Sequence, residues 1–142
     1  MTIKVENIDI HQQLTSSALN YAAEVIVARA LPDLRDGLKP VGRRIIYSMD
    51  EKHLEPTKPF RKSSYVVGNV MADYHSHGDS SIYGALVLLA QPWSQNAVLV
   101  DGHGNFGYIE GLPNAAMRYT ESRKSKYANL LIDNIKKNAV KM

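Results

Sequence analysis

Two neighbouring residues, Arg118 and Tyr119, combine side chains that can do phosphate chemistry. A phenol is a weak nucleophile, but it can attack a phosphodiester that fixed cations hold against it, and the product is a covalent aryl phosphate. Arginine suits the adjacent position because its planar guanidinium binds phosphate in bidentate fashion and keeps its charge. We therefore identify Tyr119 as a candidate nucleophile and Arg118 as a candidate phosphate ligand. The alternative is that Tyr119 is an ordinary aromatic residue at the start of a helix.

Basic residues gather in three parts of the sequence. The first group surrounds a predicted turn, the second precedes a predicted helix, and the third flanks Tyr119. They are Arg29, Arg35, Lys39, Arg43 and Arg44; Lys58, Arg61 and Lys62; and Arg118, Arg123, Lys124 and Lys126. Any one of them alone is most often a solvated surface charge, but three groups around a nucleophile favour a surface that contacts phosphates. The net charge of +3 adds little, because many proteins are this basic.

Two histidines and an aspartate, His75, His77 and Asp79, have the spacing of a metal-binding pattern. Neutral imidazoles and a carboxylate in this arrangement can bind zinc, as in binuclear metallohydrolases. That pattern continues with a further histidine, whereas this chain has Ser80 at the next position. A small metallohydrolase therefore stands as an alternative to phosphate chemistry at Tyr119.

The glycines at positions 102, 104 and 107 match the pattern of a dinucleotide-binding loop. A pyrophosphate site of that kind needs a helix that begins within the pattern. Gly111 and Pro113 disfavour such a helix, so we reject the dinucleotide interpretation. We expect the glycines to shape a loop that presents Tyr119 instead.

Composition is typical of one globular domain. The chain has 142 residues, of which 44% are hydrophobic and 22% charged. No apolar run approaches the roughly 20 residues that span a membrane, and the first nine residues lack the apolar core of a signal peptide. Because the chain has no cysteine, it can form neither a disulfide nor a thiolate metal site, which is compatible with the cytoplasm.

Four segments before Trp93 have the spacing of apolar residues that predicts an amphipathic helix. The first covers residues 14–30, and Pro32 limits it because the residue before a proline avoids helical backbone. The second covers residues 41–49, with Pro40 in its first turn. In the second helix we expect the following to point inward: Ile45, Ile46 and Met49. We expect Arg43 and Arg44 to face elsewhere.

A short, glycine-containing break separates the third and fourth helical segments. We expect Ser63 or Ser64 to cap the third, whose predicted buried stripe consists of Val66, Val67, Val70 and Met71. Asp79 and Ser80 are the expected caps of the fourth, which should end before Pro92. Two helices joined by such a turn are typical of a helix-turn-helix, although a helix pair packed only for structural reasons would look the same.

After Trp93 the pattern changes to that of a strand, over residues 97–100, and the glycine-rich stretch follows. A helix-turn-helix followed by a small β element is the winged-helix arrangement. The predicted fold class is therefore mainly α with a small β wing (α+β), a winged-helix DNA-binding domain. We expect Thr120 to cap a last amphipathic helix, with these apolar residues along it: Tyr127, Leu130, Leu131 and Ile135.

Four blocks of the sequence, in order, resemble the A-type subunits of the type IIA DNA topoisomerases, DNA gyrase and topoisomerase IV. The blocks are residues 30–41, 74–80, 99–107 and 115–121, and the resemblance extends from about Tyr21 to about Asn138. It implies that Tyr119 attacks a DNA phosphodiester and becomes attached to a 5′ end, while a second copy cuts the opposite strand.

The resemblance also implies roles for other residues. Arg118 would polarise the scissile phosphate, and Arg29, Lys39 and His75 would line the same catalytic site. The expected DNA contacts are Arg43, Arg44, Lys62, His77, Ser80 and Ser81. Ser80 matches a serine that contacts quinolone drugs, but Gly84 replaces the usual acid one helical turn later. Gly42 stands where gyrase has a histidine.

The implied partners are double-stranded DNA, a second copy bound through the helix-turn-helix face, and a B-type (ATPase/Toprim) subunit. The B-type subunit would hold the Mg²⁺ ions and use the ATP, so no metal ligand is expected in this chain and no membrane is involved. The implied location is the cytoplasm, in association with the nucleoid. These expectations belong to the family resemblance alone.

The expected organisation is an N-terminal arm at residues 1–13 and a winged-helix DNA-cleavage domain at residues 14–142. The tower, the coiled coil and the C-terminal DNA-wrapping domain of the family are absent from this sequence. We therefore do not expect the 142 residues alone to pass one duplex through another. The alternative function is that of a non-catalytic winged-helix fragment, which binds DNA or acts as a decoy.

Overall fold

The structure, a computed structural model, describes residues 9–133. The chain divides into two compact units, Met1–Leu31 and Pro32–Met142. The described part of the first unit is helix α1, Ile10–Ala30. Among the described residues, no helix combines the length and the apolar character that crossing a bilayer requires.

Helix α1 begins earlier than we expected from the sequence. Asp9 is its N-cap, and the Asp9 carboxylate accepts a hydrogen bond from the backbone N–H of His11 at 2.9 Å. This carboxylate satisfies one of the free amides of the first turn, so the helix starts at Ile10 and not near Leu14. The predicted end at Ala30 is confirmed, because Leu31, which precedes a proline, is extended.

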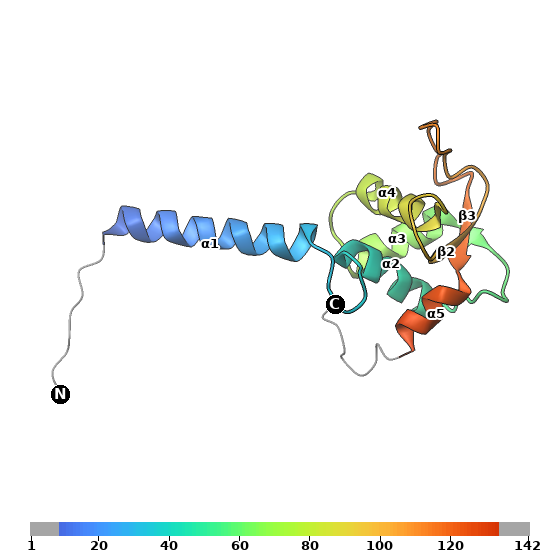
Figure 1. Cartoon of the computed structure of the whole chain (residues 1–142), viewed down its shortest axis with the longest axis horizontal. Helices are drawn as coiled ribbons and strands as arrows, with labels where there is room; N and C mark the ends of the chain where they lie inside the picture. Colours follow the sequence, from blue (N-terminus) through green and yellow to red (C-terminus); the bar gives the residue numbers. More distant parts are fainter. Residues whose placement is uncertain (1–8, 134–142) are drawn as a thin grey trace. The chain divides into compact units, whose positions relative to one another are not determined.

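The described part of the second unit, residues 32–133, contains four helices and a small sheet (Figure 1). The helices are α2 (Pro40–Glu51), α3 (Ser63–Asp73), α4 (Asp79–Ala90) and α5 (Lys126–Ile132). The strands are β1 (Arg61–Lys62), β2 (Val100–His103) and β3 (Glu121–Lys124), in the order β1-β3-β2 with both pairs antiparallel. A mainly helical fold with a small β element is therefore confirmed.

The core of this unit lies where α2, α3 and α4 pack on one another and against the sheet. The inward direction predicted for three residues of α2 is confirmed, since Ile45, Ile46 and Met49 are buried. Met71, by contrast, was expected in the buried stripe of α3 and is exposed. The other buried apolar residues include Val66, Val67, Val70, Ile82, Leu86, Val87, Leu99, Val100 and Phe106.

The predicted side-chain caps of α3 and α4 are wrong. Helix α3 begins at Ser63 itself, without a side-chain cap, and backbone carbonyls from another part of the chain take its first amides. Helix α4 has Gly78 as its N-cap, and Asp79 lies within its first turn. The Ser81 hydroxyl donates to the carbonyls of His77 and Gly78.

The segment after Tyr119 also differs from its prediction. Thr120 caps no helix, because residues 121–124 form β3, the middle strand of the sheet. Ser122 and Lys124 point into the protein, and Glu121 and Arg123 lie on the other face. The last helix starts only at Lys126, with the Ser125 hydroxyl accepting from Ala128 N–H at 3.3 Å. Ile135, expected along this helix, lies outside the described residues.

Candidate active site

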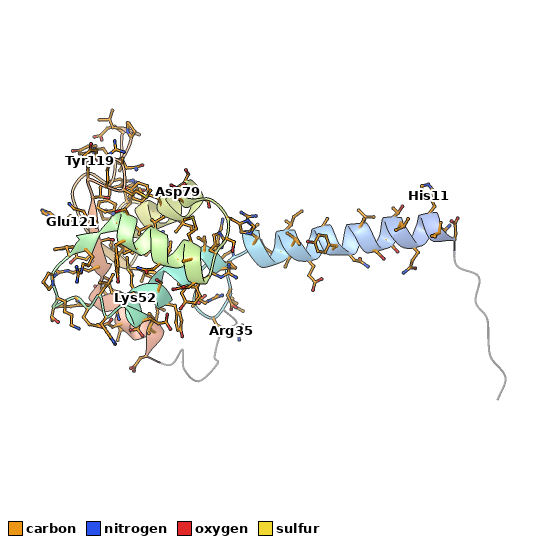
Figure 2. All side chains as sticks on the ribbon, turned by 180° about the vertical axis from the view of Figure 1, so that it is seen from behind. His11, Arg35, Lys52, Asp79, Tyr119 and Glu121 are labelled. Carbon is orange, nitrogen blue, oxygen red and sulfur yellow. The ribbon has the colours of Figure 1, made fainter. Side chains whose placement is uncertain are left out.

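Tyr119 lies on the surface of the second unit, with 66% of its area exposed. The guanidinium carbon of Arg118 lies 4.7 Å from the centre of its ring, a cation–π distance. Figure 2 shows Tyr119 and Glu121 along one edge of this unit. The phenol is therefore accessible to a large substrate and has a permanent positive charge beside it.

A buried hydroxyl network fixes the backbone next to this tyrosine. Thr120 is completely buried, and its hydroxyl donates to the hydroxyl oxygen of Ser63 at 2.9 Å. The phenolic oxygen of Tyr83 lies 2.9 Å from the same Thr120 oxygen and donates to the carbonyl of Ala115 at 2.7 Å. Because satisfied buried hydrogen bonds resist opening, they hold the loop at residues 115 and 120. Residues 116–119, which include Tyr119, form the short segment between these two fixed points.

Helix α3 holds the same loop through its backbone. The N–H of Ser63 donates to the carbonyl of Thr120 at 2.9 Å, and the N–H of Ser64 donates to the carbonyl of Met117 at 3.2 Å. The amides at the start of a helix have no partner inside the helix, so a neighbouring carbonyl can satisfy them. The loop that carries Tyr119 thus takes the place of a side-chain cap for α3.

The glycine-rich stretch supports this loop from the other side. A Cβ atom at Gly102 would lie 2.6 Å from the Phe106 ring, and one at Gly104 would lie 3.5 Å from the Tyr119 carbonyl oxygen. Gly104 also has φ +117°, which strongly favours glycine. No helix lies between β2 and β3, which confirms the rejection of the dinucleotide interpretation.

Three polar side chains form a row across the outer face of the sheet, which we call the Glu121 row: Lys62 on β1, Glu121 on β3 and His103 on β2. The Glu121 carboxylate accepts from Lys62 Nζ at 2.9 Å and lies 3.3 Å from His103 Nδ1. The hydrogen bond from Lys62, and then that from His103, hold the pKa of Glu121 below its usual range. Phe60, Arg123 and Asp101 lie beside this row.

We expected Arg43 to contact DNA and therefore to lie on the surface, but the structure places it inside the protein. Only 5% of Arg43 is exposed, and its guanidinium donates to both carboxylate oxygens of Asp36, at 2.6 and 2.9 Å. These hydrogen bonds raise the pKa of Arg43. A salt bridge with such geometry keeps this arginine inside the protein, where it fixes the turn before α2. Lys39, the N-cap of α2, is exposed.

His75 is also buried, with 7% of its area exposed. Its Nδ1 lies 2.8 Å from a guanidinium nitrogen of Arg44, and its ring packs edge-on against that of His77 at 5.0 Å. Because a guanidinium can only donate, Nδ1 of His75 must be the acceptor. Within residues 9–133, no three His, Asp or Glu side chains form a group that could hold a metal, so the metallohydrolase alternative lacks a ligand set there.

The remaining predicted contacts lie on α4, on β1 and in the first unit. Ser80 and Gly84 are exposed on α4 at a spacing that puts them on one helix face. Lys62 and Ser81 are exposed as well. Arg29 is in the last turn of α1 and is exposed, and its place beside Tyr119 stays a prediction. Gly42, which stands where gyrase has a histidine, is buried in α2.

Sequence reasoning missed what holds the site and, besides Arg43, misjudged a second cation. The hydroxyls of Ser63, Tyr83 and Thr120 were not expected to meet, since they come from three separate segments. Lys124 was counted as a surface charge, but its side chain is 1% exposed and its ammonium contacts Asp50 at 2.6 Å. Residues 121–124 are all polar and show no alternation of apolar and polar side chains, so no local pattern in the sequence indicated this burial.

Comparison with known proteins agrees with the features of this site. The chain matches the family model for the A subunit of DNA gyrase and topoisomerase IV over residues 29–142. The gyrase A protein of Streptococcus pneumoniae is 54% identical over 134 residues, which cover 94% of this chain and 16% of that protein. The gyrase A protein of Brachyspira hyodysenteriae is 51% identical over 138 residues, 97% of this chain and 16% of that protein.

These matches assign the chain first to the type II topoisomerase subunits. More specifically, it belongs to the family of the DNA gyrase and topoisomerase IV A subunits, which confirms the resemblance found in the sequence. The chain spans 16% of the length of the relatives it matches.

Proposed function

We propose that this chain is the DNA-binding and DNA-cleaving part of a type IIA topoisomerase A-type subunit, with Tyr119 as the nucleophile. The observation that carries the proposal is the placement of the tyrosine. Its ring is exposed, a guanidinium lies beside it, and a buried network fixes the backbone on which it stands. Arrangements that hold a reacting group in place before the substrate arrives lower the cost of reaching the transition state.

In the proposed reaction, the Tyr119 phenolic oxygen attacks the phosphorus atom of a DNA phosphodiester and loses its proton. The bond between phosphorus and the 3′ oxygen breaks, and the leaving 3′ oxygen takes up a proton to become a hydroxyl. The phosphate stays bonded to the tyrosine and to the 5′ end of the strand. Reversal of the same steps rejoins the strand, so no net hydrolysis occurs.

Arg118 supports this reaction through its charge. A guanidinium next to the phenol can bind the non-bridging oxygens, whose negative charge increases as the phosphorus is attacked. Lys39 and His75 remain the proposed additional ligands of the phosphate, together with Arg29 from the first unit. For His75, the acceptor role of Nδ1 towards Arg44 excludes that nitrogen as a donor to phosphate.

The partners and cofactors are also part of the proposal. The β element beside α3 and α4 fits a winged-helix domain, with duplex DNA across Lys62, Arg44, His77, Ser80 and Ser81. A B-type subunit would supply Mg²⁺, which stabilises charge on the attacking and leaving oxygens, and would use ATP. A second copy, bound through the helix-turn-helix face, would cut the other strand. We place the assembly in the cytoplasm, on the nucleoid.

The test combines the protein carrying this sequence with a B-type subunit, Mg²⁺ and supercoiled plasmid. After denaturation, protein should be found attached to 5′ ends of the DNA. Tyr119→Phe should abolish this adduct and leave DNA binding intact, with Tyr108→Phe, another exposed tyrosine, as the matched control. An adduct that persists in Tyr119→Phe would falsify the nucleophile assignment. DNA binding without any adduct in the parent would favour the non-catalytic alternative.

A further inference from the structure

The Glu121 row contains one acid between two groups that can bind an anion. We propose that Lys62 and His103 form a second phosphate-binding position beside Tyr119, which Glu121 occupies as an internal anion when no DNA is bound. This inference rests on the proposed function and adds a regulatory residue to it. Neither His103 nor Glu121 was among the site residues predicted from the sequence.

The register of the sheet creates this arrangement. Lys62 on β1 and His103 on β2 both pair with Glu121, because β3 is the middle strand. Each carboxylate oxygen contacts one of the two flanking side chains, at 2.9 Å and 3.3 Å. A phosphate group presents at least two oxygens in the same way, so it can replace the carboxylate between the two donors.

The row also faces the side from which a substrate of Tyr119 would approach. Thr120, which lies between Tyr119 and Glu121, is completely buried. Tyr119 is exposed and Glu121 lies on the outer face of β3, and Figure 2 shows the two residues along one edge of the unit. Because only Thr120 separates them, the Cα atoms of Tyr119 and Glu121 lie at most about 7 Å apart. A DNA strand whose phosphate reaches the phenol therefore brings another phosphate near the row.

The neighbouring cation is engaged elsewhere, which singles out Lys62 and His103. Arg123 pairs with Asp101 at 2.8 Å, donates to the Lys58 carbonyl at 2.8 Å, and stacks over the Phe60 ring at 4.0 Å. Only 23% of its side chain is exposed, compared with 55% for Lys62 and 74% for His103. Of these three side chains, the two more accessible ones therefore share the Glu121 carboxylate.

An internal anion of this kind weakens DNA binding until a phosphate displaces it. While Glu121 stays in place, its charge neutralises one cation and repels the DNA backbone. Only a strand that aligns with Tyr119 places a phosphate well enough to compete for both donors. Glu121 thereby favours aligned DNA over loosely bound DNA.

The experiment measures binding of duplex DNA as a function of salt for the parent and for Glu121→Gln. Removal of the charge should raise affinity by roughly threefold or more at low salt, and it should steepen the dependence of log K on log salt by about 1. Adding Lys62→Met or His103→Asn to Glu121→Gln should remove this gain. Glu110→Gln, an exposed acid in the loop between β2 and β3, changes the net charge equally and should give a smaller gain.

If the parent binds DNA and Glu121→Gln binds it equally well or more weakly, the inference is wrong and the proposed function is unaffected. An equal gain in Glu110→Gln would also contradict the inference, since it would show an effect of net charge only. If neither the parent nor the variant binds DNA, both the inference and the proposed function are wrong. Circular dichroism and thermal unfolding of each variant establish that the fold is retained.

Discussion

The phenolic oxygen of Tyr83 lies 2.9 Å from the hydroxyl oxygen of Thr120, which joins α4 to the residue that follows Tyr119. Ser63, at the start of α3, contacts the same threonine oxygen at 2.9 Å. Two helices and the loop thus meet at one buried hydroxyl. Movement of either helix would change the position of the tyrosine backbone.

Thr120→Val should separate the stability of this network from its role in cleavage. Valine has nearly the same shape but cannot form hydrogen bonds, so the buried hydroxyls of Ser63 and Tyr83 lose a partner. We expect a loss of about 1–3 kcal/mol in the free energy of unfolding, measured by urea denaturation. Adduct formation should fall more than DNA affinity, and Thr120→Ser should restore it. An equal fall in both would show that the network has only a structural role.

Gly102→Ala should destabilise the protein although it adds one methyl group. That methyl would lie 2.6 Å from the Phe106 ring, and overpacking of this kind costs about 1–3 kcal/mol. The matched control is Gly68→Ala in α3, where no atom lies within 4 Å of the new Cβ. Alanine is a better helix former, so the control should gain about 0.5–1 kcal/mol. The prediction is wrong if the urea midpoints of both variants shift in the same direction relative to that of the parent.

Lys124→Met should be strongly destabilising, unlike the loss of a surface lysine. The Lys124 ammonium lies between Asp50 at 2.6 Å and Glu55 at 3.0 Å, and its side chain is buried. Removal of one member of a buried ion pair leaves the other charges uncompensated, which costs about 3 kcal/mol or more. Lys126→Met, two residues later and exposed, should change the stability by about 0.5 kcal/mol or less. Similar thermal midpoints for both variants would show that the buried pair is not needed.

Acid should destabilise the turn before α2 through Asp33. Hydrogen bonds from the Arg35 side chain, and then from its backbone N–H, hold the pKa of Asp33 well below the ordinary value of 3.8. The native state therefore binds this proton less readily than the unfolded state, so the stabilisation is present above that value and is lost as pH falls below it. Asp33→Asn should be less stable than the parent near neutral pH.

The same variant should lose less stability than the parent when the pH is lowered from about 5 to about 2. Thermal unfolding at several pH values measures this difference. Parallel curves for the parent and Asp33→Asn would mean that the Asp33 carboxylate contributes nothing to the acid dependence.

Quinolone drugs should stabilise cleaved DNA only weakly with this protein. Gly84 replaces the acid that the family usually has one turn after the drug-contacting serine, and both Gly84 and Ser80 are exposed on α4. A Cβ at Gly84 meets no atom within 4 Å, so Gly84→Asp fits without disturbing the helix. This variant should lower the drug concentration needed for linear plasmid to accumulate. Ordinary drug sensitivity in the parent would refute the prediction.

Local patterns in the sequence predicted the helices better than the sheet. Ile45, Ile46 and Met49 recur at helical spacing, so the buried face of α2 could be recognised from neighbours in the sequence. Strand β3 has only four residues, and its partner Arg61 precedes Ser122 by about sixty positions. Pairing at that separation, and not local propensity, makes residues 121–124 a strand. The cap of α3 also depends on distant residues. Carbonyls from the loop before β3, and not the side chain of Ser63 or Ser64, satisfy its first amides.

For the candidate site, the sequence predicted the exposed side chain but not what fixes it. Tyr119 and Arg118 are adjacent, so their proximity needs no fold. The partners of Thr120 and Lys124, by contrast, come from positions more than thirty residues away. The burial of Arg43 could not be predicted either, although its partner Asp36 is close in the sequence. It depends on how the chain turns at Asp36. Whether a cation faces solvent is decided by tertiary structure.

The two amides at the start of α3 that hold the Met117 and Thr120 carbonyls have a consequence for variation under drug selection. Backbone donors persist through nearly every amino-acid replacement, and only proline at position 63 or 64 would delete one of them. Exchange of exposed side chains on α4 therefore leaves the tether between α3 and the Tyr119 loop in place. Under the proposed function, loss of drug binding and retained strand cleavage are compatible for this reason.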